Sequence, residues 1–205
     1  MPVKKLDLKK EMRELWNPPK MPVLVRVPPL NFLMIDGKGD PNTAPEYRDA
    51  IQALYTVAYT VKFTLKKSKR AIDYIVPPLE GLWWMEDMAL FSGENKDDWL
   101  WTAMIMQPPA VTTALVEKAV REAGRKKELP ALARLRLECF DEGLAAQIMY
   151  TGPFADEKPT IEKLHGFIAE QGYRRSGKHH EIYLSDFRRT APDKLRTIIR
   201  QPMTR

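Results

Sequence analysis

Residues 145–172 read AAQIMYTGPFADEKPTIEKLHGFIAEQG, and this stretch predicts a strand, a tight turn and a helix. The apolar run 145–150 is typical of a buried strand, and Gly152-Pro153 is a turn signal. From about Pro159 onward, apolar residues recur at spacings of three and four, which indicates one buried helix face. Gly172 then ends the helix, because glycine readily adopts the left-handed conformation found after helix ends.

The sequence on either side of this stretch predicts further strands. Upstream, residues 133–139 alternate between apolar and charged side chains, which is typical of a half-buried strand. Downstream, residues 180–184 and 195–201 each form a short apolar run. The last of these runs ends on Gln201-Pro202. Together these segments predict the order strand, strand, helix, strand, strand for the second half of the chain.

The first half of the chain carries the same elements in the same order. Strands are expected at 23–27 and 31–36, and a turn follows at 37–41. A helix opens at Thr43, where Glu46 three residues later completes a capping box. The strands expected after this helix are residues 72–76, 80–84 and 99–107, the last of which ends on Gln107-Pro108.

This parallel predicts an α+β fold built from a duplicated strand-helix-strand-strand module. We expect a single domain over 1–205, with a first repeat at 22–108, a connecting helix within 109–128 that stops at Gly124, and a second repeat at 129–205. Two such halves, related by a pseudo-twofold axis, would join their antiparallel sheets and leave a central ligand cleft. The alternative is that two ordinary α+β segments look alike by chance.

Composition excludes several classes of protein. The 205 residues are 44% hydrophobic and 29% charged, in the range of globular proteins, and the apolar runs are too short to span a bilayer. The basic first ten residues have no apolar stretch behind them, so we expect a cytoplasmic protein without a secretory signal. The single cysteine, Cys139, lies in the apolar alternation and is expected to be a buried, inert thiol. His179 and His180 would face opposite sides of a strand, so no metal and no cofactor is expected.

The positive charge is concentrated near the end of the chain. Residues 174–205 contain nine Lys or Arg and three Asp or Glu, an excess that equals the net charge of +6. No helix-turn-helix or zinc-finger spacing accompanies this segment, and only about 20 residues precede the first strand, so we do not expect nucleic-acid binding. A solvated basic surface is the simplest interpretation. The rival hypothesis is a protein-interaction module, an inhibitor of a nucleic-acid enzyme that docks through this surface.

Two acidic residues occupy matching places in the repeats. Glu80 precedes Gly81, and Glu181 shares one strand face with His179 and Tyr183. The opposite face, with His180, suits packing against the helices. A groove-side carboxylate beside aromatic rings could act as a base or meet a cation, whereas the alternative is a cross-strand salt bridge.

Aromatic residues are unevenly distributed. Four of the five tryptophans lie between residues 83 and 101, and Tyr55 and Tyr59 lie one helical turn apart. Aromatic walls bind flat, apolar or cationic ligands through stacking and cation–π contacts, although such clusters also form cores. The predicted ligand-binding residues are Tyr55, Tyr59, Glu80, Trp84, Trp101 and Tyr183.

The chain resembles the GyrI-like small-molecule-binding family from about Pro22 to Pro202. The motifs that carry the resemblance are Pro78-Leu79-Glu80-Gly81-Leu82-Trp83-Trp84, Glu142-Gly143-Leu144, Gly152-Pro153 and His179-His180-Glu181-Ile182-Tyr183-Leu184-Ser185-Asp186. The resemblance implies a pair of modules around a ligand cleft, in which an acidic residue within an aromatic pocket meets cationic drugs, as in multidrug recognition. Glu181 matches that acidic position.

Stand-alone members similar to this chain include hydrolases that open the cyclopropane of DNA-alkylating cyclopropanoid xenobiotics within an aromatic cage. On that model Glu181 would orient or deprotonate the attacking water, and Tyr150 or Tyr55 would donate a hydrogen bond to the developing oxyanion. Trp84 and Trp101 would hold the flat substrate by stacking. Tyr150 stands where the family commonly has His, and Phe154 stands where it commonly has Tyr.

Overall fold

The computed structural model describes residues 5–69, 71–88 and 96–205, which form two compact units. Unit 1 comprises Met1–Glu11, Leu30–Pro77 and Trp84–Phe140. Unit 2 comprises Met12–Pro29, Pro78–Trp83 and Asp141–Arg205. Each unit therefore contains segments from both halves of the sequence. Within the described residues, no helix is long and apolar enough to cross a membrane.

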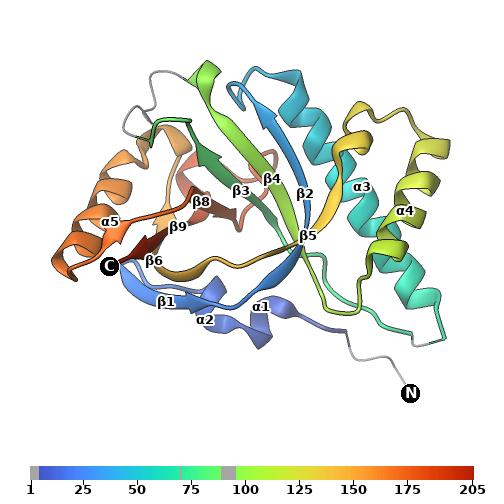
Figure 1. Cartoon of the computed structure of the whole chain (residues 1–205), viewed down its shortest axis with the longest axis horizontal. Coiled ribbons are helices and arrows are strands. Elements are labelled where there is room, and N and C mark those ends of the chain that lie inside the picture. Colours follow the sequence, from blue (N-terminus) through green and yellow to red (C-terminus); the bar gives the residue numbers. More distant parts are fainter. Residues whose placement is uncertain (1–4, 70, 89–95) are drawn as a thin grey trace. The chain divides into compact units, whose positions relative to one another are not determined.

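Unit 1 is a three-stranded antiparallel sheet with one long helix on it (Figure 1). Its elements are α1 (Leu8–Glu11), β2 (Leu30–Lys38), α3 (Pro45–Lys67), β4 (Leu100–Gln107), α4 (Thr113–Lys126) and β5 (Arg136–Phe140). The sheet order is β4-β2-β5. The apolar stripe of α3 is buried and packs on β2 and β4, while α4 packs against α3 and β5.

Unit 2 is a five-stranded antiparallel sheet in the order β1-β6-β9-β8-β3, and the short β7 pairs with the far end of β9. Its elements are α2 (Arg13–Trp16), β1 (Val23–Val27), β3 (Leu79–Trp84), β6 (Gly143–Thr151), α5 (Lys158–Glu170), β7 (Arg174–Arg175), β8 (His179–Tyr183) and β9 (Arg196–Thr204). The last residue of β3, Trp84, is assigned to unit 1. Helix α5 lies against β6 and β9 (Figure 1). It buries Leu164 and Ile168 in one cluster with Ile148 of β6 and Ile199 of β9.

The two units share one plan. In unit 1 the pair β2–β4 is covered by α3, and in unit 2 the pair β6–β9 is covered by α5. Each pair is extended by a strand from the other half of the sequence, β5 in unit 1 and β1 in unit 2. The predicted α+β class with antiparallel sheet pairing is confirmed. The shared plan supports duplication, which stays a prediction.

Two expectations for the first half were wrong. Residues 72–76 do not form a strand, because only Tyr74 is paired there, in a single bridge to Leu6. The capping box is also absent: α3 begins at Pro45, and the preceding Ala44 makes no side-chain cap. Proline is favoured in the first turn of a helix because its φ is already helical and its missing N–H would have no partner there.

Three expectations for the middle of the chain were also wrong. Gly124 does not stop the connecting helix, since α4 continues through it to Lys126. Residues 130–134 form a 3₁₀ turn, so the strand begins only at Arg136. Cys139 is exposed rather than buried. Alternation shows which residues share a face, but Cys139 lies on β5, the edge strand of the order β4-β2-β5, which has a neighbouring strand on one side only.

Candidate functional site

The candidate site is one face of the unit 2 sheet, which we call the Glu181 face. Cross-strand pairing places Tyr150, Thr197 and Tyr183 in one row and Ile148, Ile199, Glu181 and Gly81 in the next. Directly paired residues point to the same side of a sheet, so these side chains share a face. Because Ile148 and Ile199 pack on α5, this is also the face that the helix covers. The expectation that the His180 face packs against the helix was therefore wrong.

Glu181 is the buried acid of this face. Its side chain lies on a residue that is only 7% exposed, and His179 Nε2 lies 3.1 Å from its Oε1. Burial alone would raise the pKa of Glu181, but hydrogen bonding to His179, the charge of His179 and hydrogen bonds to Tyr183 and Glu157 together hold that pKa below its usual value. Glu181 is therefore an ionised carboxylate within a mostly apolar surface.

Aromatic rings lie next to this carboxylate. The indole nitrogen of Trp83 donates a hydrogen bond to the Tyr183 hydroxyl at 3.0 Å, and Phe154 packs edge-on against the Tyr183 ring at 5.7 Å between centroids. A Cβ on Gly81 would lie 2.7 Å from the Trp83 nitrogen and 3.0 Å from the Tyr183 hydroxyl. Glycine at position 81 therefore makes room for this hydrogen bond.

Tyr150 supplies a hydroxyl on the same face. In this structure it donates to the carbonyl oxygen of Pro153 at 2.8 Å. Burial, and then the charges of Asp156 and Glu157, raise the pKa of Tyr150. The hydroxyl therefore keeps its proton at neutral pH and can act only as a donor or a neutral acceptor.

Glu80 lies on the opposite face, as part of a buried ionic network. His180 lies between two carboxylates, 3.0 Å from Glu80 and 2.8 Å from Glu142, and Arg200 donates to Glu142 at 3.1 Å. Burial alone would raise the pKa of Glu142, but the charges of His180 and Arg200 and their hydrogen bonds lower it to about 2. Burial would lower the pKa of His180, but the charge and hydrogen bond of Glu142, with those of Glu80, raise it to about 9. Glu80 is thus paired with His180 inside unit 2.

The predicted aromatic ligand residues of unit 1 differ in exposure. On α3, Tyr55 stacks on Tyr59 at 6.4 Å, Tyr59 stacks on Phe63 at 6.3 Å, and Tyr59 is 47% exposed. Trp101, by contrast, is 0% exposed and packs edge-on against Tyr47 at 5.0 Å. A stacking role for Trp101 would require that contact to open. Trp84 is partly buried.

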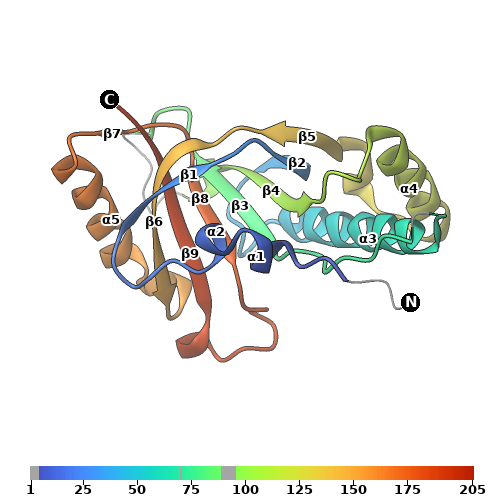
Figure 2. The same ribbon diagram turned by 90° about the horizontal axis from the view of Figure 1, so that it is seen from below.

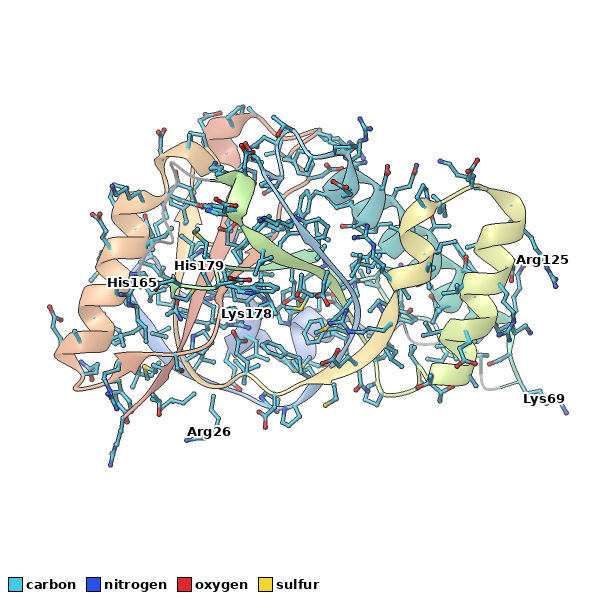
Figure 3. All side chains as sticks on the ribbon, turned by 45° about the horizontal axis from the view of Figure 1, so that its top comes forward. Arg26, Lys69, Arg125, His165, Lys178 and His179 are labelled. Atoms are coloured by element: carbon cyan, nitrogen blue, oxygen red, sulfur yellow. The ribbon has the colours of Figure 1, made fainter. Side chains whose placement is uncertain are left out.

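Four contributors to the Glu181 face were not among the predicted site residues. These are Trp83, Phe154, Glu157 and His179. The strand period placed His179 on the same face as Glu181, but no role in the site was assigned to it. Trp83 could have been chosen over Trp84, because Gly81 two residues earlier indicated a close approach on that face. Figure 3 labels His179 on β8 and His165 on α5, on the side of unit 2 that the helix covers.

Neither metal ligands nor a uniform basic surface emerge from the described residues. They contain no group of three side chains suited to a metal ion, and His179 and His180 point to opposite faces. Among the basic residues of 174–205, Arg200 is buried in the ionic network, and Arg188 makes two hydrogen bonds to the Asp186 carboxylate. The basic surface is therefore smaller than the sequence count indicated, and a protein partner for it stays a prediction.

Comparison with known proteins gives consistent matches over nearly the whole chain. Residues 20–203 match the GyrI-like small molecule binding domain. An uncharacterized conserved protein from Listeria innocua is similar at 42% identity and a TM-score of 0.91, with 98% of this chain and 100% of that chain covered. Two hydrolase structures from Listeria innocua have 39% and 42% identity and TM-scores of 0.86 and 0.87, with the same coverage. No protein of curated function matches significantly.

Proposed function

This chain belongs to the GyrI-like small-molecule-binding family, and from that premise we propose that it binds flat hydrophobic or cationic xenobiotics at the Glu181 face. The observation that carries the proposal is an ionised carboxylate held by His179 beside the rings of Trp83, Tyr183 and Phe154. A carboxylate attracts a cation strongly where water is scarce, and ring faces add cation–π contacts. Charge and aromatic surface together favour a flat cation over either a polar or a compact ligand.

The other predicted ligand residues are not part of this proposal. Tyr55 and Tyr59 stack on each other on α3 of unit 1, and their ligand-binding role stays a prediction from the sequence. The ligand-binding roles of Glu80, Trp84 and Trp101 also stay predictions from the sequence. Glu80 is engaged by His180, and Trp101 is enclosed.

Binding can be tested by fluorescence titration with ethidium, a flat cation of fixed charge. We expect Glu181→Gln to weaken ethidium binding by about 10- to 100-fold, the size of a lost charge-assisted interaction. The matched control is Glu162→Gln, which removes the same charge from an exposed position of α5 and should bind like the wild type. Equal affinity of Glu181→Gln and wild type would place the cation elsewhere.

We further propose that bound cyclopropanoids are hydrolysed at this face, in keeping with the hydrolase descriptions of two similar proteins. Water forms a bond to a ring carbon, the strained carbon–carbon bond breaks, and its electron pair moves to the conjugated carbonyl oxygen. Glu181 takes the proton of the water, and the Tyr150 hydroxyl, released from Pro153, donates a hydrogen bond to the developing oxyanion. The oxyanion then takes up a proton from solvent, and Glu181 returns its proton to solvent.

Two assays distinguish turnover from binding, one of the ring-opening rate and one of the fluorescence quenching by the compound. Glu181→Gln should lower the ring-opening rate by roughly 10²–10⁴-fold, the usual size of a general-base effect. If the compound quenches the tryptophan fluorescence of the wild type but its ring is never opened, the protein is a sequestering binder rather than a hydrolase.

A further inference from the structure

The two polar groups to which we assign ligand chemistry are covered in this structure. Glu181 is 7% exposed and Tyr150 is 9% exposed, although both side chains lie on the face proposed to bind a ligand. A flat molecule of several rings can contact a carboxylate only where the carboxylate oxygens are accessible. An element that covers the Glu181 face therefore has to move before such a ligand binds.

The turn between β6 and α5 lies across one row of this face. The row consists of Tyr150 on β6, Thr197 on β9 and Tyr183 on β8. The carbonyl oxygen of Pro153 accepts from Tyr150, whereas the next residue, Phe154, packs edge-on against Tyr183. These two contacts are two strand spacings apart, about 10 Å, so the turn passes over Thr197, which is buried. The side chains of residues 154–156 are exposed on the outer side of the turn.

Hydrogen bonds and a glycine hold the turn in this position. The Tyr150 hydroxyl donates to the Pro153 carbonyl oxygen at 2.8 Å, and the Gly152 N–H donates to the Leu195 carbonyl oxygen at 3.0 Å. Gly152 has a φ of +147°, and a Cβ at this position would lie 2.6 Å from the Tyr150 hydroxyl oxygen. Glycine adopts this conformation readily and leaves room for the tyrosine. The turn is thus fixed where it leaves β6.

Helix α5, which also covers this face, is harder to move than the turn. Its Leu164 and Ile168 are buried in the cluster with β6 and β9. Lifting the helix would expose both side chains to water, and the free-energy cost rises with the apolar area exposed. Lifting the turn breaks the Tyr150 hydrogen bond and the Phe154 ring contact. Segments with exposed side chains open at a lower free energy than core helices, so the turn is the element that opens.

We propose that residues 152–157 form a lid on the Glu181 face. The lid opens when the Tyr150 hydroxyl leaves the Pro153 carbonyl and the Phe154 ring lifts from the sheet. In the closed lid the hydroxyl is occupied, so the movement that admits a ligand also makes this hydroxyl available to it. The admission of a ligand rests on the proposed function, whereas the opening of the lid does not.

Hydrogen exchange tests the lid without any ligand. The backbone N–H of Asp156 donates to the Pro153 carbonyl oxygen at 3.0 Å, so its exchange reports the opening of the turn. Tyr150→Phe should speed this exchange by about 2- to 10-fold, the size of one lost hydrogen bond, and leave Ile168 of α5 unchanged. Tyr173→Phe removes a hydroxyl just beyond the other end of α5 and is the matched control. Wild-type exchange of Asp156 in Tyr150→Phe would overturn the lid.

Stopped-flow fluorescence with ethidium tests the admission of a ligand. Tyr150→Phe and Phe154→Ala should each raise the association rate constant by about 2- to 10-fold, because each raises the fraction of molecules with an open lid. Phe187→Ala removes another exposed ring of unit 2 and should associate like the wild type.

The outcomes separate the lid from the proposed function. If ethidium binds but both lid variants associate at the wild-type rate, control of entry by the lid is refuted and the proposed function stands. If ethidium does not bind although Tyr150→Phe speeds the exchange of Asp156, the proposed function and control of entry both fail, and the opening turn stands.

Discussion

The indole nitrogen of Trp83 donates a hydrogen bond of 3.0 Å to the hydroxyl of Tyr183, and the two residues are 100 positions apart in the sequence. The bond links β3 to β8 on the Glu181 face. Because Trp83 is buried, its N–H would lack water as a substitute partner if Tyr183 were shortened. This contact therefore orients the tyrosine ring next to Glu181 as well as holding two strands together.

A double-mutant cycle measures this bond. Trp83→Phe and Tyr183→Phe should each lower the free energy of unfolding by about 1 kcal/mol or more, since each leaves a polar partner behind. The double variant should cost less than the sum, with a coupling of about 0.5–1.5 kcal/mol in urea denaturation. Strict additivity would show that the hydrogen bond contributes nothing to stability.

A methyl group at position 81 should disturb the same contact. Gly81→Ala places its Cβ 2.7 Å from the Trp83 nitrogen, so we expect a loss of about 1–3 kcal/mol in unfolding free energy and weaker ligand binding. The control is Gly166→Ala in the middle of α5, where an added Cβ meets nothing within 4 Å. That change should stabilise by about 0.5–1 kcal/mol, because alanine is the better helix former. A Gly81→Ala variant as stable as wild type would mean that the two rings can move apart freely.

The ionic network around His180 predicts a loss of stability in alkali. Its pKa is raised from 6.5 to about 9, so its contribution is fully present below about pH 6.5 and disappears as the pH rises through 9. Urea denaturation at a series of pH values should show this decline, and His180→Gln should remove it while lowering stability at neutral pH. His165→Gln is the control: the pKa of His165 is lowered to about 4, so its contribution is lost toward acid and the alkaline decline should persist.

Local sequence patterns predicted most elements but not how their faces are covered. The strand at 180–184 and the helix from Pro159 correspond to β8 and α5, because each carries a regular apolar period. Periodicity also placed His179, Glu181 and Tyr183 on one face. Which face meets α5 depends on pairing across β6, β9 and β8, and no local period contains that information. The prediction therefore selected the wrong side for the helix.

The site was predicted only as far as its residues interact within one strand. The role of Trp83 comes from its hydrogen bond to Tyr183 of β8, 100 positions away in the sequence. Glu80 and Glu181 matched each other in the repeat, but Glu80 pairs with Ile182 across β3 and β8, while Glu181 pairs with Gly81. Adjacent pairs in a ladder point to opposite faces, so the two acids have different environments and different partners.

Arg200 attaches the amino-terminal segment of unit 2 to the sheet, and this leads to the last prediction. Its guanidinium donates to Glu142 at 3.1 Å, to the Gln147 side chain at 3.0 Å and to the carbonyl oxygen of Leu15 at 2.7 Å. Figure 2 shows α2, which contains Leu15, beside β9.

Arg200→Lys keeps the charge, but a single ammonium cannot reproduce this planar set of bonds. Because the group is buried, we expect a loss of about 2–4 kcal/mol in unfolding free energy and faster hydrogen exchange in residues 13–16. Arg188→Lys, at an exposed pair with Asp186, should change stability by less than about 0.5 kcal/mol. Equal effects of the two lysine substitutions would show that Arg200 acts only through its charge and that α2 is held by its apolar contacts.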